Sequence, residues 1–267
     1  MNKLQTIFAT AFLAASGSLW AAGANENSSE TAVAANVPTH AAAVAGSRAK
    51  TGVADDIFLS RVFQDLYGRS PIASEVEAHL SALKAGTTTR GEIVATLFNA
   101  PEFRDNAAYV VKCYLTIMRR DPDFTGWSQI YKLMRAGTME ETVLSAFLKT
   151  PEYAAAYPAN MSDAAFLETV YHNMLGREPN AEEVDSLRSK LDQGGARGEV
   201  LQTVLTSPEF DAHIAGRVNA NLAFLAFLRR GGDAAGLEKW TAALQSGVPV
   251  SDLVGAFIAS PGYASRF

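Results

Sequence analysis

Four arginines recur along the chain with spacings that suit anion binding or ion pairing. Six residues before each arginine stands an aromatic residue, and 31 or 32 residues after it a proline opens a short aromatic motif. The arginines are Arg69, Arg120, Arg177 and Arg230, and the prolines are Pro101, Pro151, Pro208 and Pro261. A guanidinium binds carboxylates and phosphates, and it also binds helix C-terminal carbonyls. The pattern therefore indicates either an array of sites for anions or acidic glycans, or a structural tie that is repeated four times.

Acidic residues beside the prolines favour the structural interpretation. Three of the four motifs carry a glutamate directly after the proline, and these are Glu102, Glu152 and Glu209. A packing device recurs in every segment, whereas a functional site needs to occur only once. We therefore predict that Arg69, Arg120 and Arg177 are structural residues that pair with these glutamates across a partly buried contact.

The fourth motif differs from the other three. Gly262 stands where the glutamate is expected, and Asp252 is the acidic residue that could replace it. Without a glutamate partner, Arg230 and its neighbour Arg229 become candidates for outward binding.

Three further aromatic residues lie outside the recurrent set and near the arginine loops. They are Trp127, Tyr131 and Trp240. Together with Arg229 and Arg230 they are the candidate ligand-binding residues, since aromatic rings stack on sugars and guanidinium groups bind anions. The competing interpretation is that the three rings are buried within the helical core.

The chain contains residue types that bind metals, but their spacing does not match a metal site. The histidines lie far apart, with no i, i+4 pair and no cysteine beside them, and they are His40, His79, His172 and His213. Asp121, Asp123, Thr125 and Gly126 match the first ligand positions of an EF-hand loop, but Lys132 stands where the bidentate glutamate is needed. We therefore expect no metal and no cofactor, and we interpret the aspartate loop as a proline turn that caps the next helix.

Nucleophilic catalysis finds no support in the motifs. The single cysteine, Cys113, occupies a position where the other segments have Val62, Val170 and Ala223, which predicts a buried, inert thiol. No pair of acidic residues has a recognisable catalytic spacing. We therefore expect that the protein is not an enzyme, and a cell-wall-active enzyme is the least favoured alternative.

Composition and charge narrow the class of partner. The 267 residues are 48% hydrophobic and 19% charged, with a formal net charge of -5, as in ordinary globular proteins. This charge provides no basic field for a phosphate backbone, so we expect no nucleic-acid partner. One cysteine excludes an intrachain disulfide framework.

The first 52 residues are typical of an export signal and a linker. Residues 1–24 combine Lys3, a short apolar run and small residues before the expected cleavage point, as in a signal peptide. Residues 25–52 are rich in Ala, Ser, Asn and Thr without periodicity, which is typical of a flexible linker. The apolar run is too short for a permanent membrane span, and no second one follows. We therefore predict a secreted protein, periplasmic or extracellular, with no integral membrane segment after signal cleavage.

The remaining chain has helical periodicity throughout and predicts an all-α fold. Apolar residues before each arginine repeat with helical spacing, and a central glycine 14 or 15 residues before each proline suits a left-handed helix end. A third helix should start at the capping-box patterns Thr89–Glu92 and Thr138–Glu141, and a fourth, short helix at each proline.

These recurrences predict four tandem repeats of about 50 residues, each built from three to four short helices. Odd-numbered and even-numbered repeats differ at the position six residues after the arginine. Repeats one and three have Glu75 and Glu183 there, whereas repeats two and four have Gly126 and Gly236. A duplicated two-repeat unit explains this alternation. We accordingly divide the chain into residues 53–160, with repeats one and two, and 161–267, with repeats three and four.

The third repeat resembles a known bacterial family. Its run Gly-Arg-Glu-Pro at residues 176–179 and its ending Ser-Pro-Glu-Phe at 207–210 are similar to a repeat known as a domain of unknown function. That family occurs in exported proteins, alongside surface-layer and RTX-type calcium-binding regions, and the resemblance extends over about residues 55–267. A looser similarity exists to phycobilisome linker domains. The resemblance implies a helical extracytoplasmic module and no established activity.

Two functions from different classes remain at this point. The first is a non-enzymatic module that binds an envelope or extracellular protein, or a surface polymer, because stacked repeats present extended surfaces. The second is a carbohydrate-binding module that uses the aromatic patch and the nearby arginines.

Overall fold

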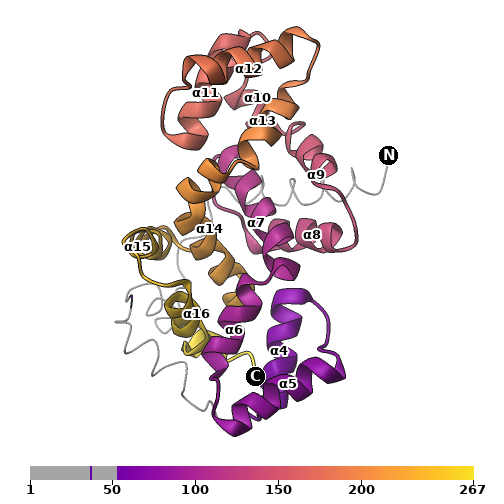
Figure 1. Ribbon diagram of the computed structural model, residues 1–267, viewed down its shortest axis with the longest axis vertical. Helices are drawn as coiled ribbons and strands as arrows, with labels where there is room; N and C mark the ends of the chain where they lie inside the picture. Colours follow the sequence, from indigo (N-terminus) through magenta and orange to yellow (C-terminus); the bar gives the residue numbers. More distant parts are fainter. Residues whose placement is uncertain (1–36, 38–52) are drawn as a thin grey trace.

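The computed structural model describes Val37 and residues 53–267, and this part of the chain is helical (Figure 1). The all-α prediction is confirmed there, since the described residues form fourteen α-helices and no strand. The predicted signal peptide, residues 1–24, and nearly all of the linker, residues 25–52, lie outside the described residues. Among the helices described, none combines the length and the apolar character that crossing a bilayer requires.

The helices follow one another closely along the chain. The first seven are α4 (Asp55–Tyr67), α5 (Ala73–Ala85), α6 (Arg90–Asn99), α7 (Pro101–Thr116), α8 (Phe124–Arg135), α9 (Glu140–Phe147) and α10 (Pro151–Ala156). The last seven are α11 (Asp163–Leu175), α12 (Ala181–Asp192), α13 (Arg197–Leu205), α14 (Pro208–Leu228), α15 (Ala234–Gln245), α16 (Val250–Ile258) and α17 (Pro261–Ala264).

The molecule is elongated, and two long helices occupy its middle. Figure 1 places α4 and α5 at one end and α11 and α12 at the other, with α7 and α14 between them. Helix α14 packs against α7, α6 packs against α16, and α9 packs against α13. The segments 53–160 and 161–267 therefore interleave instead of folding as separate bodies, and they share one continuous hydrophobic core.

The first two helices of each segment are followed by a residue in the left-handed conformation. The central glycines Gly86, Gly137, Gly194 and Gly247 all have positive φ, between 70° and 96°, as predicted. The residue just before each recurrent arginine is also left-handed. This residue is Gly68 or Gly176 in the odd segments and Arg119 or Arg229 in the even ones. A non-glycine residue meets steric repulsion in this conformation, so the even loops hold their backbone at some cost.

One of the two predicted capping boxes forms and the other does not. Thr89 accepts a hydrogen bond from the Glu92 N–H, and the Glu92 carboxylate accepts one from the Thr89 N–H. Helix α9 instead begins at Glu140, after Met139, so the prediction for Thr138 was wrong. The Thr138 N–H donates to the Leu133 carbonyl at 3.1 Å and thereby completes the end of α8.

The predicted proline starts are confirmed, but the prediction that these helices are all short was wrong. Helices α7, α10, α14 and α17 all begin at the proline, and hydroxyls of Thr150, Ser207 and Ser260 cap three of them. However, α7 has 16 residues and α14 has 21, because each continues into the helix that leads to the next arginine. Helices α10, with 6 residues, and α17, with 4, are the short ones, and α10 stops because Pro158 follows Tyr157 and disfavours helical backbone there.

Candidate ligand-binding groove

Arg69 and Arg177, the arginines of the first and third segments, are each held by two carboxylates. We call these two the odd arginines, and Arg120 and Arg230 the even arginines. The Arg69 Nε donates to Glu102 Oε1 at 2.7 Å, and its two terminal nitrogens donate to Glu75 at 2.8 Å. The guanidinium also lies over the Phe63 ring, 5.2 Å from its centroid. We call this arrangement, an arginine on an aromatic ring and between two glutamates, the arginine clasp. It ties the end of α4 to the starts of α5 and α7.

A second clasp has the same geometry. Arg177 lies 5.2 Å from the centroid of the Tyr171 ring and donates to Glu183 and Glu209 at 2.6 to 2.8 Å. Glu183 also accepts the Asn180 N–H at 2.8 Å, so one carboxylate both caps α12 and holds the arginine. Charge-assisted hydrogen bonds of this kind are about twice as strong as neutral ones.

These contacts shift the acidity of the carboxyl groups. Hydrogen bonds from Arg69 lower the pKa of Glu75 to about 2, and Arg177 lowers the pKa of Glu183 and of Glu209 in the same way. The pKa of each clasp arginine is raised correspondingly. The polar groups of the clasps are therefore mutually satisfied and act as structural ties.

The even arginines also lie over an aromatic ring, but they lack the two glutamates that hold the odd arginines. Arg120 lies 4.9 Å from the Tyr114 ring centroid, and Arg230 lies 5.0 Å from that of Phe224. Their ion-pair contacts are longer, at 3.5 Å to Asp123 and 3.6 Å to Asp233. The Arg120 Nη2 and the Arg230 Nε are buried without a hydrogen-bond partner.

The predicted pair between Arg120 and Glu152 does not form among the described residues. Arg120 instead contacts Asp123 at 3.5 Å and donates to the Asp121 carbonyl at 3.3 Å. The second glutamate of the clasp is also missing here, because Gly126 stands at its position. A Cβ atom on Gly126 would lie 2.2 Å from the Tyr114 hydroxyl, so the tyrosine occupies the space that a larger side chain needs.

The candidates in the fourth segment are divided between surface and core. Arg229 is exposed and lies over the Phe124 ring, 5.3 Å from its centroid. Arg230 is half-buried and contacts Asp233, while Asp252, the expected replacement, is buried in the first turn of α16.

The three aromatic candidates do not form a ligand surface. Trp127, Tyr131 and Trp240 are at most 4% exposed. The Trp127 Nε1–H donates to the Ala107 carbonyl at 3.2 Å, and the Tyr131 hydroxyl donates to the Leu66 carbonyl at 2.7 Å. Their prediction as ligand-binding residues was wrong, because Trp127 and Tyr131 belong to the core stripe of α8 and Trp240 to the buried face of α15.

Potential metal ligands remain apart in the described part of the chain, where no three His, Cys, Asp or Glu side chains come together as a cation site. His40 lies outside the described residues. In the aspartate loop, Asp123 caps α8 by accepting the Gly126 N–H at 2.7 Å, and Asp121 pairs with Arg217. Cys113 is fully buried, and burial raises the pKa of its thiol.

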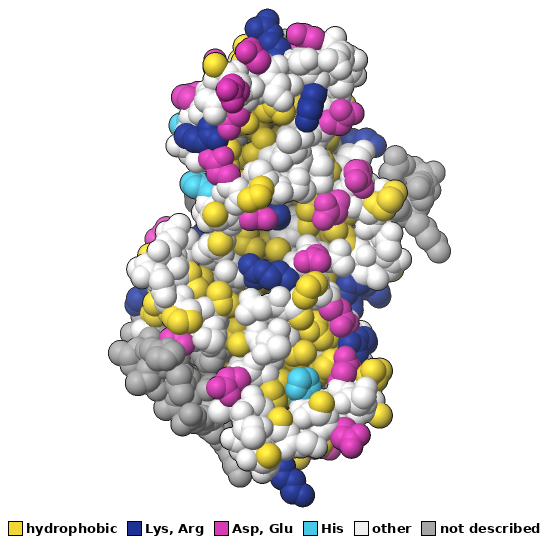
Figure 2. All heavy atoms as spheres, in the orientation of Figure 1, with side chains coloured by type: hydrophobic (Ala, Val, Ile, Leu, Met, Phe, Trp, Pro, Cys, Tyr) yellow, Lys and Arg dark blue, Asp and Glu magenta, His cyan; other side chains and the backbone are white. Residues whose placement is uncertain are grey.

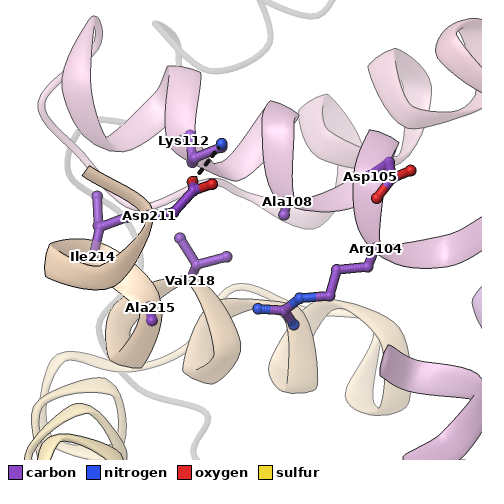
Figure 3. A pocket seen from close by; sticks show the side chains of 8 residues that line it. All are labelled: Arg104, Asp105, Ala108, Lys112, Asp211, Ile214, Ala215 and Val218. Atoms are coloured by element: carbon purple, nitrogen blue, oxygen red, sulfur yellow. Dashed lines mark hydrogen bonds and ion pairs between the residues drawn. The ribbon is translucent and has the colours of Figure 1, made fainter. Parts of the chain in front are cut away.

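A groove between α7 and α14 is lined by charged and apolar side chains in about equal number (Figure 3). Its volume is about 300 Å³, at the lower end of the range for small-ligand sites. The polar residues that line it are Arg104, Asp105, Lys112 and Asp211, and the apolar ones are Ala108, Ile214, Ala215 and Val218. The two helices contribute four residues each, so the groove exists only because they pack side by side.

The two basic groups of the groove have different partners. Lys112 Nζ donates to Asp211 at 2.7 Å and to the Leu205 carbonyl at 3.0 Å, so its charge is paired. The Arg104 guanidinium donates to the Asn219 amide oxygen at 2.6 Å, and that partner is neutral. Among the described residues, no carboxylate lies within ion-pair distance of Arg104, and burial lowers its pKa. Arg104 is therefore a half-buried cation that forms no ion pair among the described residues, although the carboxylates of Asp211 and Asp105 lie near enough to favour its charged form.

The sequence reasoning missed this groove. Arg104 and Asn219 are 115 residues apart, and the two helices were expected to stop after a few residues. The one local signal is the position of Arg104 directly after the buried Phe103, on the side of the helix that turns inward.

Comparison with known protein families gives a match to one part of the chain. A family model described as "Domain of unknown function (DUF4214)" matches residues 144–214. This segment runs from α9 into α14 and contains the whole Arg177 clasp and the groove residues Asp211 and Ile214. A search of curated proteins gives no match.

Proposed function

We propose that the protein is a non-enzymatic helical module that is exported to the cell envelope and binds a protein or a surface polymer there. The observation that carries this proposal is the groove between α7 and α14, which contains a half-buried arginine whose one recorded hydrogen bond goes to a neutral amide. A half-buried guanidinium held by a single neutral partner has donors left for a ligand.

We also propose that the scaffold consists of four repeats in two duplicated pairs. Each of the four recurrent arginines lies over the aromatic ring six residues before it, at 4.9 to 5.2 Å. A left-handed residue precedes each arginine, and a left-handed glycine follows the second helix of each segment. On this interpretation α6 with α16, and α9 with α13, are equivalent pairs, and the groove lies at the centre where the two duplicated units meet.

The location and the class of partner extend the same proposal. The signal-peptide pattern of residues 1–24 supports export to the periplasm or beyond. Figure 2 shows acidic and basic side chains interspersed over one face of the molecule, without a basic patch of the kind that binds nucleic acid. The carbohydrate-binding alternative loses its main support, because its three aromatic rings lie in the core.

Site-specific crosslinking tests the binding function. A photo-crosslinking residue at Ala215, in the groove, is compared with the same residue at Ser186, which is exposed on α12. We expect one crosslinked envelope component from Ala215 and none from Ser186, with mass spectrometry identifying it as protein or polymer. Equal products from both positions, or none from either, would contradict the proposal. A chain that retains Met1 and is found in a membrane fraction would separately contradict export.

A further inference from the structure

The geometry of the groove points to the chemistry of its ligand. We propose that the groove between α7 and α14 binds a short peptide segment of the partner, with a carboxylate of that segment paired to Arg104. This inference rests on the proposed binding function and adds the ligand class and the residue that recognises it.

The first step is the state of Arg104. Its guanidinium can donate five hydrogen bonds, and the one recorded in the structure goes to the amide oxygen of Asn219 at 2.6 Å. The contrast lies within the same chain, since Arg69 and Arg177 each hold two carboxylates. Asn219 fixes the direction of the guanidinium and leaves most of its donors for a planar carboxylate, which pairs with arginine in bidentate fashion.

The second step is the arrangement of the other lining groups. In Figure 3, Arg104 reaches from α7 toward α14 at one end of the groove, and the Lys112–Asp211 pair closes the other end. Because Lys112 is already paired with Asp211 at 2.7 Å, Arg104 is the basic group of the groove that has no ion pair among the described residues. Asp105 is exposed and lies next to it, so a ligand with a second positive group near its carboxylate would also be accepted.

The third step distinguishes a peptide from a sugar. The lining between the charged ends consists of the small aliphatic side chains of Ala108, Ala215 and Val218, and the described lining contains no aromatic ring. Pyranose sugars need a ring to stack on and several hydrogen-bond donors, whereas a peptide offers aliphatic side chains beside its carboxylate. A volume of about 300 Å³ accommodates one or two side chains, which matches a Glu or Asp followed by an aliphatic residue.

Nuclear magnetic resonance of the full chain tests this with two capped peptides, Ac-Ala-Glu-Leu-Ala-amide and its Gln counterpart. The readouts are the Arg104 Nε–H resonance and the methyl resonances of Ala108 and Val218. We expect the Glu peptide to shift all three and to bind about tenfold more tightly than the Gln peptide, the difference of one charge-assisted contact. Equal affinity for the two peptides, or no shift of the Arg104 resonance, would overturn the inference.

Variants separate recognition from folding. Arg104→Gln should leave the circular dichroism spectrum unchanged and abolish the preference for Glu over Gln, whereas Arg104→Lys should retain part of it. Arg188→Gln removes the same charge from an exposed position on α12 and should leave both affinities unchanged. If Arg104→Gln unfolds the protein, the comparison of the two peptides on the unchanged chain still decides the matter.

A sugar ligand gives a different outcome. Tetragalacturonate is the matching carboxylate on a glycan, and if it shifts the groove resonances while the Glu peptide does not, the peptide assignment is wrong. Crosslinks from Ala215 combined with equal Glu and Gln affinities would leave the binding module standing and refute the carboxylate contact. A preference for the Glu peptide that depends on Arg104, without any crosslink from Ala215, would support the carboxylate contact and contradict the binding module.

Discussion

Arg266, the penultimate residue, forms an ion pair with Asp65 of α4 and so joins the end of the chain to its first described helix. The Asp65 side chain is 3% exposed and that of Arg266 is 12% exposed. Arg266 also donates to the Phe227 carbonyl of α14. One residue therefore links α4, α14 and the C-terminal turn, in a place where the charge of Asp65 has little access to water.

We predict that Arg266→Ala destabilises the protein by about 3 kcal/mol, because removing one partner of a buried pair leaves the other charge unpaired. Urea unfolding followed by circular dichroism measures the change. Arg188→Ala, on exposed α12, is the matched control and should change stability by less than about 0.5 kcal/mol. The double variant Asp65→Leu with Arg266→Met should recover most of the loss, since an apolar pair removes the desolvation cost. A loss that persists in the double variant would assign the effect to the Phe227 contact instead.

Acid should remove the stability that the clasps contribute. The pKa of Glu75 is about 2 in the folded chain, below its ordinary value of 4.5, because Arg69 stabilises the charged form. A lowered carboxyl pKa contributes stability that is present above pH 4.5 and is lost as the pH falls through 4.5 toward 2. The lowered pKa values of Glu183 and Glu209 act in the same direction.

The measurement is the unfolding free energy between about pH 6 and about pH 2.5, a range that spans most of this loss. We expect it to fall over this range, and to fall less steeply in Glu75→Gln than in the unchanged chain. Glu182→Gln, which removes an exposed carboxylate next to Glu183, is the control for charge. A Glu75→Gln profile with the same slope as the unchanged chain would show that the clasp does not contribute to acid sensitivity.

The odd arginines should contribute more to thermal stability than the even ones. Arg177 makes four hydrogen bonds to two carboxylates, whereas Arg230 has one ion-pair contact at 3.6 Å. We expect Arg177→Ala to lower the melting temperature by about 2–4 °C, the size of a loss of about 1 kcal/mol for a half-exposed network in a chain of this length. Arg230→Ala should lower it by less than half as much. Differential scanning calorimetry of the two variants compares them, and a larger effect for Arg230→Ala would contradict the clasp argument.

Local helix signals were predictable from the sequence, and long-range packing was not. The left-handed glycines and the proline starts depend on backbone geometry within a few residues, so Gly86 and Pro208 could be placed correctly. The length of α14 could not be predicted in the same way, because continuation past residue 214 depends on packing against α7, α15 and α16.

The aromatic candidates were misplaced for a related reason. Trp127, Ile130, Tyr131 and Met134 lie at helical spacing, and this stripe does predict the buried face of α8. The same spacing favours the competing interpretation, burial in the core, and the structure buries both Trp127 and Tyr131. The groove could not be predicted from a sequence pattern, because its lining combines residues from two helices that only the tertiary fold brings together.

The last prediction concerns the glycine that distinguishes an even loop from an odd one. A Cβ atom on Gly126 would lie 2.2 Å from the Tyr114 hydroxyl oxygen and 3.3 Å from the ring carbon that carries it. The first distance is impossible, whereas the second is only tight, as is the distance of 3.2 Å to Asp123 Oδ2, so the severe clash resides in the tyrosine oxygen. Gly126→Ala should therefore destabilise the protein by about 2 kcal/mol, even though alanine is the better helix former.

Removing that oxygen provides the test. In the double variant Tyr114→Phe with Gly126→Ala, the new methyl group keeps only the tight contacts, to the ring and to Asp123 Oδ2 at 3.2 Å, and the alanine should cost less than about 1 kcal/mol relative to Tyr114→Phe alone. A double-mutant cycle by urea unfolding measures this coupling. If Gly126→Ala costs the same in both backgrounds, the glycine is required by something other than Tyr114. The lack of a second clasp carboxylate at Arg120 would then have a cause other than steric exclusion by the tyrosine hydroxyl.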